Sequence, residues 1–317
     1  MLNDCKLYLG CVTRNVIDAS IEYANDNNVK IGLIPTRRQI EHDKGYTLLN
    51  TQEFASYVKE KSKNVVVQRD HAGPNQGRED GDGLDSLSVD SEFFDIIHLD
   101  PWKKYNNFEE GLNETIKLIE HCLQKNFSGT FEIGTEQSIR KFEPEEIDCL
   151  LKSCEKYGIE YIVIQSGTSL KENVNTGSYS GERLKDMIEV ASKYNVKTKE
   201  HNGDYITPSL IKQKFDLGLS SINIAPEFGL IETNCYLDKI GNNSHLNNIY
   251  FDLCYQSNQW KKWVDKDFDP SNKLKLMQIC GHYVIQEKTF QEQIKSEFPN
   301  IDDEIKYKMK DRIKEIL

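Results

Sequence analysis

An arginine, an aspartate and a histidine stand together where a strongly apolar stretch of the sequence ends. Residues 65–74 read VVVQRDHAGP. Consecutive valines are typical of a strand buried on both faces, and the glycine–proline pair ends such a strand. Arg69, Asp70 and His71 are therefore predicted at the carboxyl end of a strand, where parallel α/β proteins hold their catalytic groups. Asp70 and His71 are the first candidates for catalysis.

Polar residues also follow the other predicted strands. Their ends carry Arg37, Asp70, His71, His98, Asp100, Glu132, Glu136, Gln165, Glu200, His201, Asp204, Asn223 and Glu227. Imidazoles and carboxylates gathered at one mouth predict a divalent metal site or an acid–base cluster. His71 and His201, with Glu132, are the candidate ligands for zinc or manganese. His98 has apolar neighbours on both sides and is expected to be a hydrogen-bonded core residue.

The elements that position these residues alternate in type along the chain. Strand-like runs cover residues 6–12, 31–36, 65–69, 94–100, 129–135, 159–165, 195–201 and 220–225. Helix candidates lie between them at residues 15–24, 51–61, 108–124, 144–157, 180–194 and 208–217. This alternation predicts parallel βα units, and about eight of them close a barrel. A (β/α)8 TIM barrel is favoured over an open sheet because no GxGxxG turn follows the first strand.

The alternation ends near residue 237, and helical patterns follow. Residues 302–317 place Ile305, Met309, Ile313 and Ile316 on one helix face. We therefore expect a barrel over residues 1–240 and a helical C-terminal extension over 241–317, packed on the barrel or on a partner subunit. Residues 73–91, rich in Gly, Asp and Ser, are predicted as a long loop that is either a lid or an acidic excursion.

Composition and charge limit the classes of partner that the chain could bind. A chain of 317 residues with a net charge of −11 repels nucleic acid and anionic membranes, and no basic stripe offsets that charge. The apolar runs are too short to span a bilayer, and the start of the chain does not resemble a signal peptide. The eight cysteines form no CxxC pair and are expected to be reduced. These features predict a cytoplasmic protein.

Five motifs follow one another in the order RDHAGP, IIHLDPWKKYNNFEEGLNETIKLIEH, FEIGTE, KEHNGDY and SSINIAPEFG. Together they resemble the class II, metal-dependent ketose-bisphosphate aldolase superfamily, with the closest likeness to the accessory (GatZ/KbaZ-like) subunits of tagatose-bisphosphate aldolase. The resemblance runs from about residue 8 to residue 238. It implies a TIM barrel, a divalent metal, a sugar or sugar-phosphate substrate, and a homo-oligomer or a partner aldolase subunit.

The resemblance also implies roles for single residues. Asp70 matches the general acid–base, with Glu132 and Asp100 as further catalytic groups. His71, His201 and Glu132 match the metal ligands, with zinc favoured and manganese or magnesium as alternatives. The chemistry implied is reversible aldol cleavage, in which the metal stabilises an enediolate. The residues expected to bind substrate are Arg37, Gln165, Asn202, Asp204, Asn223 and Glu227.

Two positions depart from the catalytic aldolases. The sixth strand ends in Gln165, Ser166 and Gly167 where those enzymes have a third metal-binding histidine, so a three-histidine site is not expected. Asp204 stands in the segment that matches their phosphate-binding loop and would repel a phosphate.

Four functions remain open from the sequence. They are an aldolase, a sugar-phosphate 4-epimerase that uses the same retro-aldol site, a non-catalytic stabilising subunit, and an enzyme that forms a Schiff base. The last is raised by Lys197 and Lys199, which share strand parity with His201.

Overall fold

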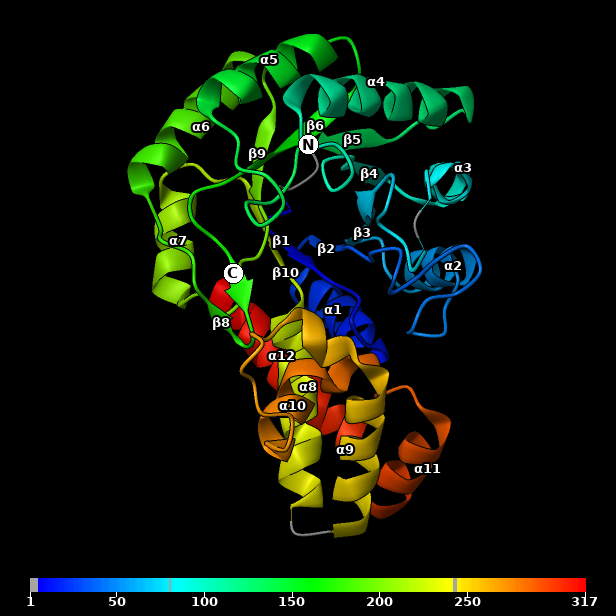
Figure 1. Cartoon of the computed structure of the whole chain (residues 1–317). Coiled ribbons are helices and arrows are strands. Elements are labelled where there is room, and N and C mark those ends of the chain that lie inside the picture. The colour runs from blue at the N-terminus through cyan, green and yellow to red at the C-terminus, as the bar shows by residue number, and fades with distance from the viewer. Residues whose placement is uncertain (1–4, 80, 242–243) are drawn as a thin grey trace.

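The structure is a computed structural model that describes residues 5–79, 81–241 and 244–317. Eight parallel strands close into a barrel in the order β1-β10-β9-β6-β5-β4-β3-β2 (Figure 1). They are β1 (Leu7–Leu9), β2 (Ile31–Leu33), β3 (Val65–Ala72), β4 (Ile96–Leu99), β5 (Thr130–Ile133), β6 (Ile159–Ile164), β9 (Lys197–Glu200) and β10 (Ser221–Ile224). Each corresponds to a predicted run, and the predicted (β/α)8 barrel is confirmed.

Helices cover the outside of the barrel. They are α1 (Arg14–Asn27), α2 (Thr51–Lys61), α3 (Leu84–Phe93), α4 (Phe108–Gln124), α5 (Pro144–Cys154), α6 (Gly181–Lys193), α7 (Pro208–Asp216) and α8 (Pro226–Ile240). Six of the eight were predicted from the sequence, whereas α3 and α8 were not. Helix α3 occupies much of the predicted 73–91 loop, so the segment between β3 and α3 is shorter than expected.

Alternation along each strand separates an apolar outer face from a polar barrel interior. In β4 and β5, Ile97 and Phe131 pack outward against the helices. The side chains that point into the barrel include Gln68, Glu132 and Lys199. All three are fully buried, and they contact one another through hydrogen bonds and an ion pair. The barrel core is therefore polar below its carboxyl-terminal mouth.

The helices that follow the barrel form the expected C-terminal extension, which gathers at one side of the barrel in Figure 1. They are α9 (Ser244–Ser257), η1 (Gln259–Lys262), α10 (Lys273–Cys280), η2 (Gly281–Tyr283), α11 (Lys288–Glu297) and α12 (Ile301–Ile316). Helix α12 packs on α1 and α8 through the predicted apolar face. One hydrophobic cluster contains both barrel and extension residues. The division into two units at residue 240 stays a prediction.

A short hairpin that the sequence did not reveal follows β6. Its strands are β7 (Leu170–Lys171) and β8 (Val174–Asn175). Glu172 at its turn donates its backbone N–H to the carbonyl of Trp263 at 3.2 Å. The hairpin thereby joins a loop at the carboxyl end of the barrel to the extension. None of the described helices is long and apolar enough to cross a membrane.

Candidate metal centre

A bulge in β3 brings Asp70 and His71 to the same side of the strand. Consecutive strand residues normally point to opposite faces. Here the register with β4 shifts between Arg69 and Ala72, and His71 adopts a left-handed φ of 47°. Such bulges redirect side chains next to active sites. Arg69 points the other way and forms a buried, two-pronged ion pair with Asp90 of α3.

Four side chains converge at the carboxyl end of the barrel: Asp70, His71, His98 and His201. Each offers one potential ligand atom, and the four atoms lie within 4.8 Å of one another. Asp70 Oδ1 lies 3.8 Å from His71 Nε2, 3.4 Å from His98 Nδ1 and 3.9 Å from His201 Nδ1. Strands β3, β4 and β9 therefore deliver an N₃O donor set around one point.

His71 is held from behind by a carboxylate. Its Nδ1–H donates to Asp100 Oδ2 at 2.6 Å, and Thr135 donates to the same oxygen at 2.9 Å. Asp100 is fully buried. A carboxylate on the far nitrogen fixes the orientation of a metal-binding imidazole and increases its basicity. Asp100 was predicted to be catalytic. In the structure it lies behind His71 and acts on the four convergent side chains only by orienting His71.

His98 is held by the backbone, and its environment defines its tautomer. The carbonyl of Gly134 can only accept, so His98 Nε2 carries the hydrogen of the 3.0 Å bond between them. The backbone N–H of His71 donates to the one lone pair of His98 Nδ1 at 3.2 Å, so a metal ion bound at Nδ1 would take the place of this hydrogen bond. The expectation that His98 is a hydrogen-bonded core residue was therefore incomplete: His98 is buried and hydrogen-bonded, and it also completes a three-histidine group.

His201 rests on a buried polar network. Its Nε2 lies 2.7 Å from Glu132 Oε1. The other carboxylate oxygen, Oε2, lies 2.5 Å from the ammonium of Lys199 and accepts from Gln68 at 2.7 Å. The Lys199 ammonium also lies 3.4 Å from the centre of the Tyr8 ring. Glu132, predicted as a ligand, is committed to these partners and acts as a support for His201.

Charge pairing dominates the electrostatics of the group. Burial disfavours the ionised form of Asp70, but His71, His98 and His201 outweigh it and lower the pKa of Asp70 to about 2. Burial also disfavours the charged form of His71, yet Asp70, Asp100 and Glu136 raise its pKa to about 10. The bare group therefore holds a proton on His71, and metal binding at Nε2 releases that proton.

The group is reached by solvent on the side of His71 and Glu136, whose side chains expose 15% and 19% of their surface. Glu136 Oε2 lies 3.8 Å from His71 Nε2 and accepts from Asn202 Nδ2 at 2.8 Å. Asn202, predicted to bind substrate, thus lies at the open side. Glu136 was noted at a strand end but was assigned no role from the sequence. Here it adds a carboxylate at the mouth.

Two predicted substrate-binding residues lie elsewhere. Gln165 donates to the carbonyls of Thr135 and Arg140 and accepts from the N–H of Phe142, so its amide is fully used. Arg37 pairs with Glu41 at 2.6 Å and lines a separate surface pocket. The structure therefore gives Gln165 a structural role, tying the end of β6 to the segment after β5.

Asp204 and Glu227 bind the start of α8. Asp204 Oδ1 accepts from the N–H groups of Ala225 and Glu227, at 2.9 and 2.8 Å. Glu227 accepts from the N–H of Tyr205 and from Arg312 of α12, both at 2.6 Å. Burial, then the charge of Glu227, raises the pKa of Asp204 to about 8. These two carboxylates are engaged in holding the β9 loop, α8 and α12 together.

Asn223 is different, because both polar atoms of its amide are buried without a hydrogen-bond partner among the residues that the structure describes. Its neighbours Ile222 and Ile224 pack in the outer core, so alternation turns Asn223 into the barrel. An unpartnered buried amide is costly, which fits a group that awaits a polar ligand.

The spacing of the donor atoms fits a small divalent metal ion such as zinc. Tetrahedral zinc with bonds of about 2.0 Å to nitrogen and oxygen places neighbouring ligand atoms about 3.3 Å apart. The 3.4–3.9 Å separations around Asp70 Oδ1 exceed this by only a few tenths of an ångström. The far nitrogens of all three imidazoles contact a carboxylate or a carbonyl, as in known zinc sites. The expectation that a three-histidine site is not available was wrong, because β4 supplies the histidine that β6 lacks.

Comparison with known proteins supports the fold. No family model and no curated protein matches the sequence. Among solved structures, the chain is similar to one described as a probable tagatose 6 phosphate kinase from Sinorhizobium meliloti 1021, with a TM-score of 0.76, 15% identity, and coverage of 94% of this chain and 87% of that chain. It is similar to the fructuronate-tagaturonate epimerase UxaE from Cohnella laeviribosi, with a TM-score of 0.67, 10% identity, and coverage of 99% and 81%. It is also similar to the YdjI aldolase from Escherichia coli K12, with a TM-score of 0.55, 12% identity, and coverage of 92% and 91%.

These neighbours have the same barrel fold as this chain. The chain shares its TIM-barrel fold with the YdjI aldolase and with the fructuronate-tagaturonate epimerase, and this is the fold that its motifs predicted. At 10–15% identity, the likeness establishes the fold.

Proposed function

We propose that this chain is a metal-dependent carbohydrate enzyme that catalyses reversible aldol cleavage of a ketose or sugar phosphate. The observation that carries the proposal is the convergence of Asp70, His71, His98 and His201 at the catalytic end of the barrel. Three imidazoles favour zinc, with manganese and magnesium as alternatives, and leave a coordination position open for substrate beside Asp70. A bound divalent cation would polarise the substrate carbonyl and stabilise the negative charge of the enediolate.

The residues of the chain supply orientation and proton transfer. Asp70 stays ionised because its pKa is held near 2, so it can accept a proton from the hydroxyl next to the bond that breaks. Loss of that proton turns the C–O bond into a carbonyl, and the electrons of the broken C–C bond pass to the enediolate. Asn223, with its unpartnered amide, and Asn202, at the open side, are positioned to bind sugar hydroxyls.

The proposal is tested by turnover on a panel of ketose phosphates and unphosphorylated ketoses. Activity should disappear with a chelator and return with zinc or manganese. His71→Ala and His201→Ala should retain neither metal nor activity, whereas His42→Ala, a surface variant, should retain both. Metal retention in both ligand variants would refute the ligand set.

A second candidate is 4-epimerisation, in which the cleaved halves rotate and rejoin. The likeness to the epimerase extends over 99% of the chain at a TM-score of 0.67, against 0.55 for the YdjI aldolase. Product analysis by NMR separates the two, because an aldolase releases two fragments and an epimerase returns one sugar. Absence of both turnover and bound metal would favour a stabilising subunit. Borohydride trapping tests the Schiff-base alternative at Lys199.

A further inference from the structure

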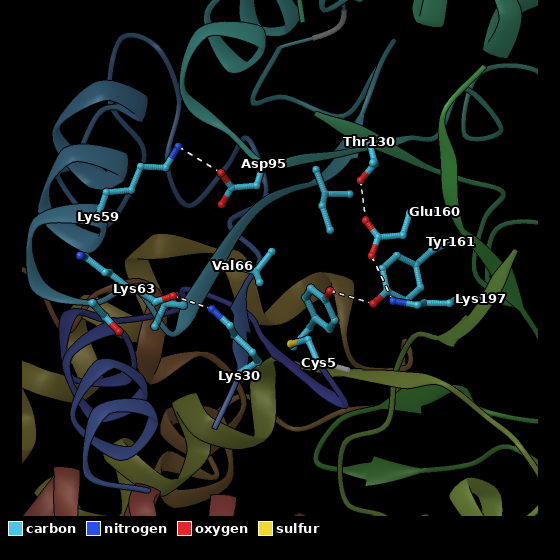
Figure 2. Close-up of a pocket in the computed structure, with 14 residues that line it drawn as sticks. Cys5, Lys30, Lys59, Lys63, Val66, Asp95, Thr130, Glu160, Tyr161 and Lys197 are labelled. Carbon is cyan, nitrogen blue, oxygen red and sulfur yellow. Dashed lines mark hydrogen bonds and ion pairs between the residues drawn. The ribbon is translucent and has the colours of Figure 1, made fainter. Parts of the chain in front are cut away.

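A second cavity opens at the end of the barrel opposite the histidine group. Its volume is about 530 Å³. It lies where the strands begin, and its lining includes Lys30, Lys63, Val66, Ile96, Tyr161 and Lys197 (Figure 2). Strand starts and strand ends lie at opposite mouths of a parallel barrel. A ligand in this cavity would therefore not compete with substrate at the metal centre.

The rim of the cavity is cationic although the chain as a whole carries a charge of −11. Four lysines face two carboxylates. Lys59 pairs with Asp95 at 3.2 Å, and Lys197 lies 3.4 Å from Glu160. After these two pairs are formed, two positive charges remain, those of Lys30 and Lys63.

Lys30 and Lys63 lie together on one side of the cavity in Figure 2. Lys30 donates to the backbone carbonyl of Lys63 at 2.5 Å, and that carbonyl carries no full charge. Among the described residues, neither lysine has a carboxylate within ion-pair distance. In Figure 2 the Lys63 side chain is directed away from the Lys30 ammonium, so the two unpaired charges make one side of the cavity positive rather than meeting at one point. A positive side without counterions attracts an anion.

The floor of the cavity is apolar and rigid. Tyr161 and Ile96 are buried, and Val66 joins them in a small interior cluster. The Tyr161 ring packs edge-on against Tyr8 at 5.8 Å, and the two hydroxyls hydrogen-bond at 3.2 Å. Figure 2 places Val66 between the Lys30 side and the Tyr161 side. A ligand would meet charge at one edge and aromatic and aliphatic surface beneath.

We infer that this cavity is a binding site for a small amphiphilic anion. The ligand would have a carboxylate, sulfonate or phosphate head on Lys30, with Lys63 adding positive charge on the same side, and an apolar body over Val66, Ile96 and Tyr161. An apolar pocket with a few convergent charged groups is the usual form of a small-molecule site. The site is independent of the reaction proposed for the metal centre.

The probe for the test is 8-anilinonaphthalene-1-sulfonate, which becomes fluorescent in apolar surroundings. We expect one molecule to bind per chain, in wild type and in His71→Ala alike. The double variant Lys30→Gln/Lys63→Gln should weaken binding about fivefold, the effect of losing two partly exposed charges. The double variant Lys212→Gln/Lys288→Gln removes the same charge elsewhere and should bind like wild type.

Displacement by alkanesulfonates of increasing chain length tests the apolar floor. Each added CH₂ should strengthen displacement about two- to fourfold until the cavity is filled. Equal binding by the two double variants would overturn the inference, as would loss of binding in His71→Ala. Displacement by inorganic phosphate as effective as that by the alkanesulfonates would show that the floor contributes nothing, and would also overturn it.

Discussion

Substitution of His98 distinguishes the ligand set seen in the structure from the ligand set expected from the sequence. In the structure His98 Nδ1 faces Asp70 at 3.4 Å and belongs to the donor set. In the expected ligand set of His71, His201 and Glu132, His98 has no part. His98→Ala should therefore weaken metal binding in the first case and leave it unchanged in the second.

The expected loss follows from the size of the donor set. Four-ligand zinc sites bind with about 10–16 kcal/mol, so one ligand of four contributes about 3 kcal/mol, or roughly a 100-fold change in affinity. The substitution also removes the hydrogen bonds of His98 to Gly134 and from His71, and it leaves a cavity. We expect an additional loss of fold stability of about 2–3 kcal/mol.

The assay is zinc affinity by competition with a chromophoric chelator, at a temperature where circular dichroism shows each variant folded. His98→Asn fills part of the volume and keeps a polar group, so it separates ligand loss from packing loss. His121→Ala is the matched control, because His121 contacts Ser88 on the outer helices. Wild-type affinity in both His98 variants, with affinity lost in His71→Ala, would refute the three-histidine centre.

Three further predictions concern the supports of the centre and the fold. Glu132→Gln keeps the shape of the side chain but weakens the hydrogen-bond acceptor for His201 Nε2. Zinc affinity should therefore fall about 10–100-fold in the same competition assay. An unchanged affinity would contradict the role of Glu132 as a support for His201. Lys199→Met leaves the buried Glu132 carboxylate without its cation and should lower the free energy of unfolding, measured in urea, by about 3–5 kcal/mol. The exposed control Lys261→Met should change it by no more than about 0.5 kcal/mol. Similar values for the two variants would refute the buried pair. Burial raises the pKa of Glu232 from 4.5 to about 7, so the folded state binds the extra proton and stability falls as pH rises from 4.5 to 7, by at most about 3 kcal/mol. Glu232→Gln should flatten that part of the stability–pH curve, and parallel curves would show that Glu232 does not cause it.

Helix α3 shows where local sequence is a poor guide. Its residues LDSLSVDSEF include three serines and two aspartates, which favour turns over helix interiors. In the structure Ser88 and Ser91 donate to carbonyls four residues earlier, and Asp90 pairs with the buried Arg69. The pair between Asp90 and Arg69 of β3 stabilises a helix that local propensity does not predict.

His98 carried a signal that was available before the structure. In IIHLD, Ile97 and Leu99 pack outward in the helix-facing core, so alternation turns His98 into the barrel, beside its register partner Glu132. Its apolar neighbours in sequence occupy the opposite face. The alternation of side chains along the strand, rather than the apolar nature of the adjacent residues, would have placed His98 among the candidate metal ligands.

The sequence by itself determined the barrel, because strand-like runs closed by polar residues are local patterns that recur eight times, with amphipathic helices predicted between most of them. It also determined that Asp70, His71 and His201 lie at one mouth, since strand ends share an edge. Only the tertiary structure decided which groups meet there. The β3 bulge turns Asp70 and His71 to the same side, and β4 supplies the third imidazole. The side chains of Gln165 and Asp204 form hydrogen bonds with backbone groups instead of facing the centre. These outcomes depend on register and on contacts between distant segments, which the pattern within any one segment does not contain.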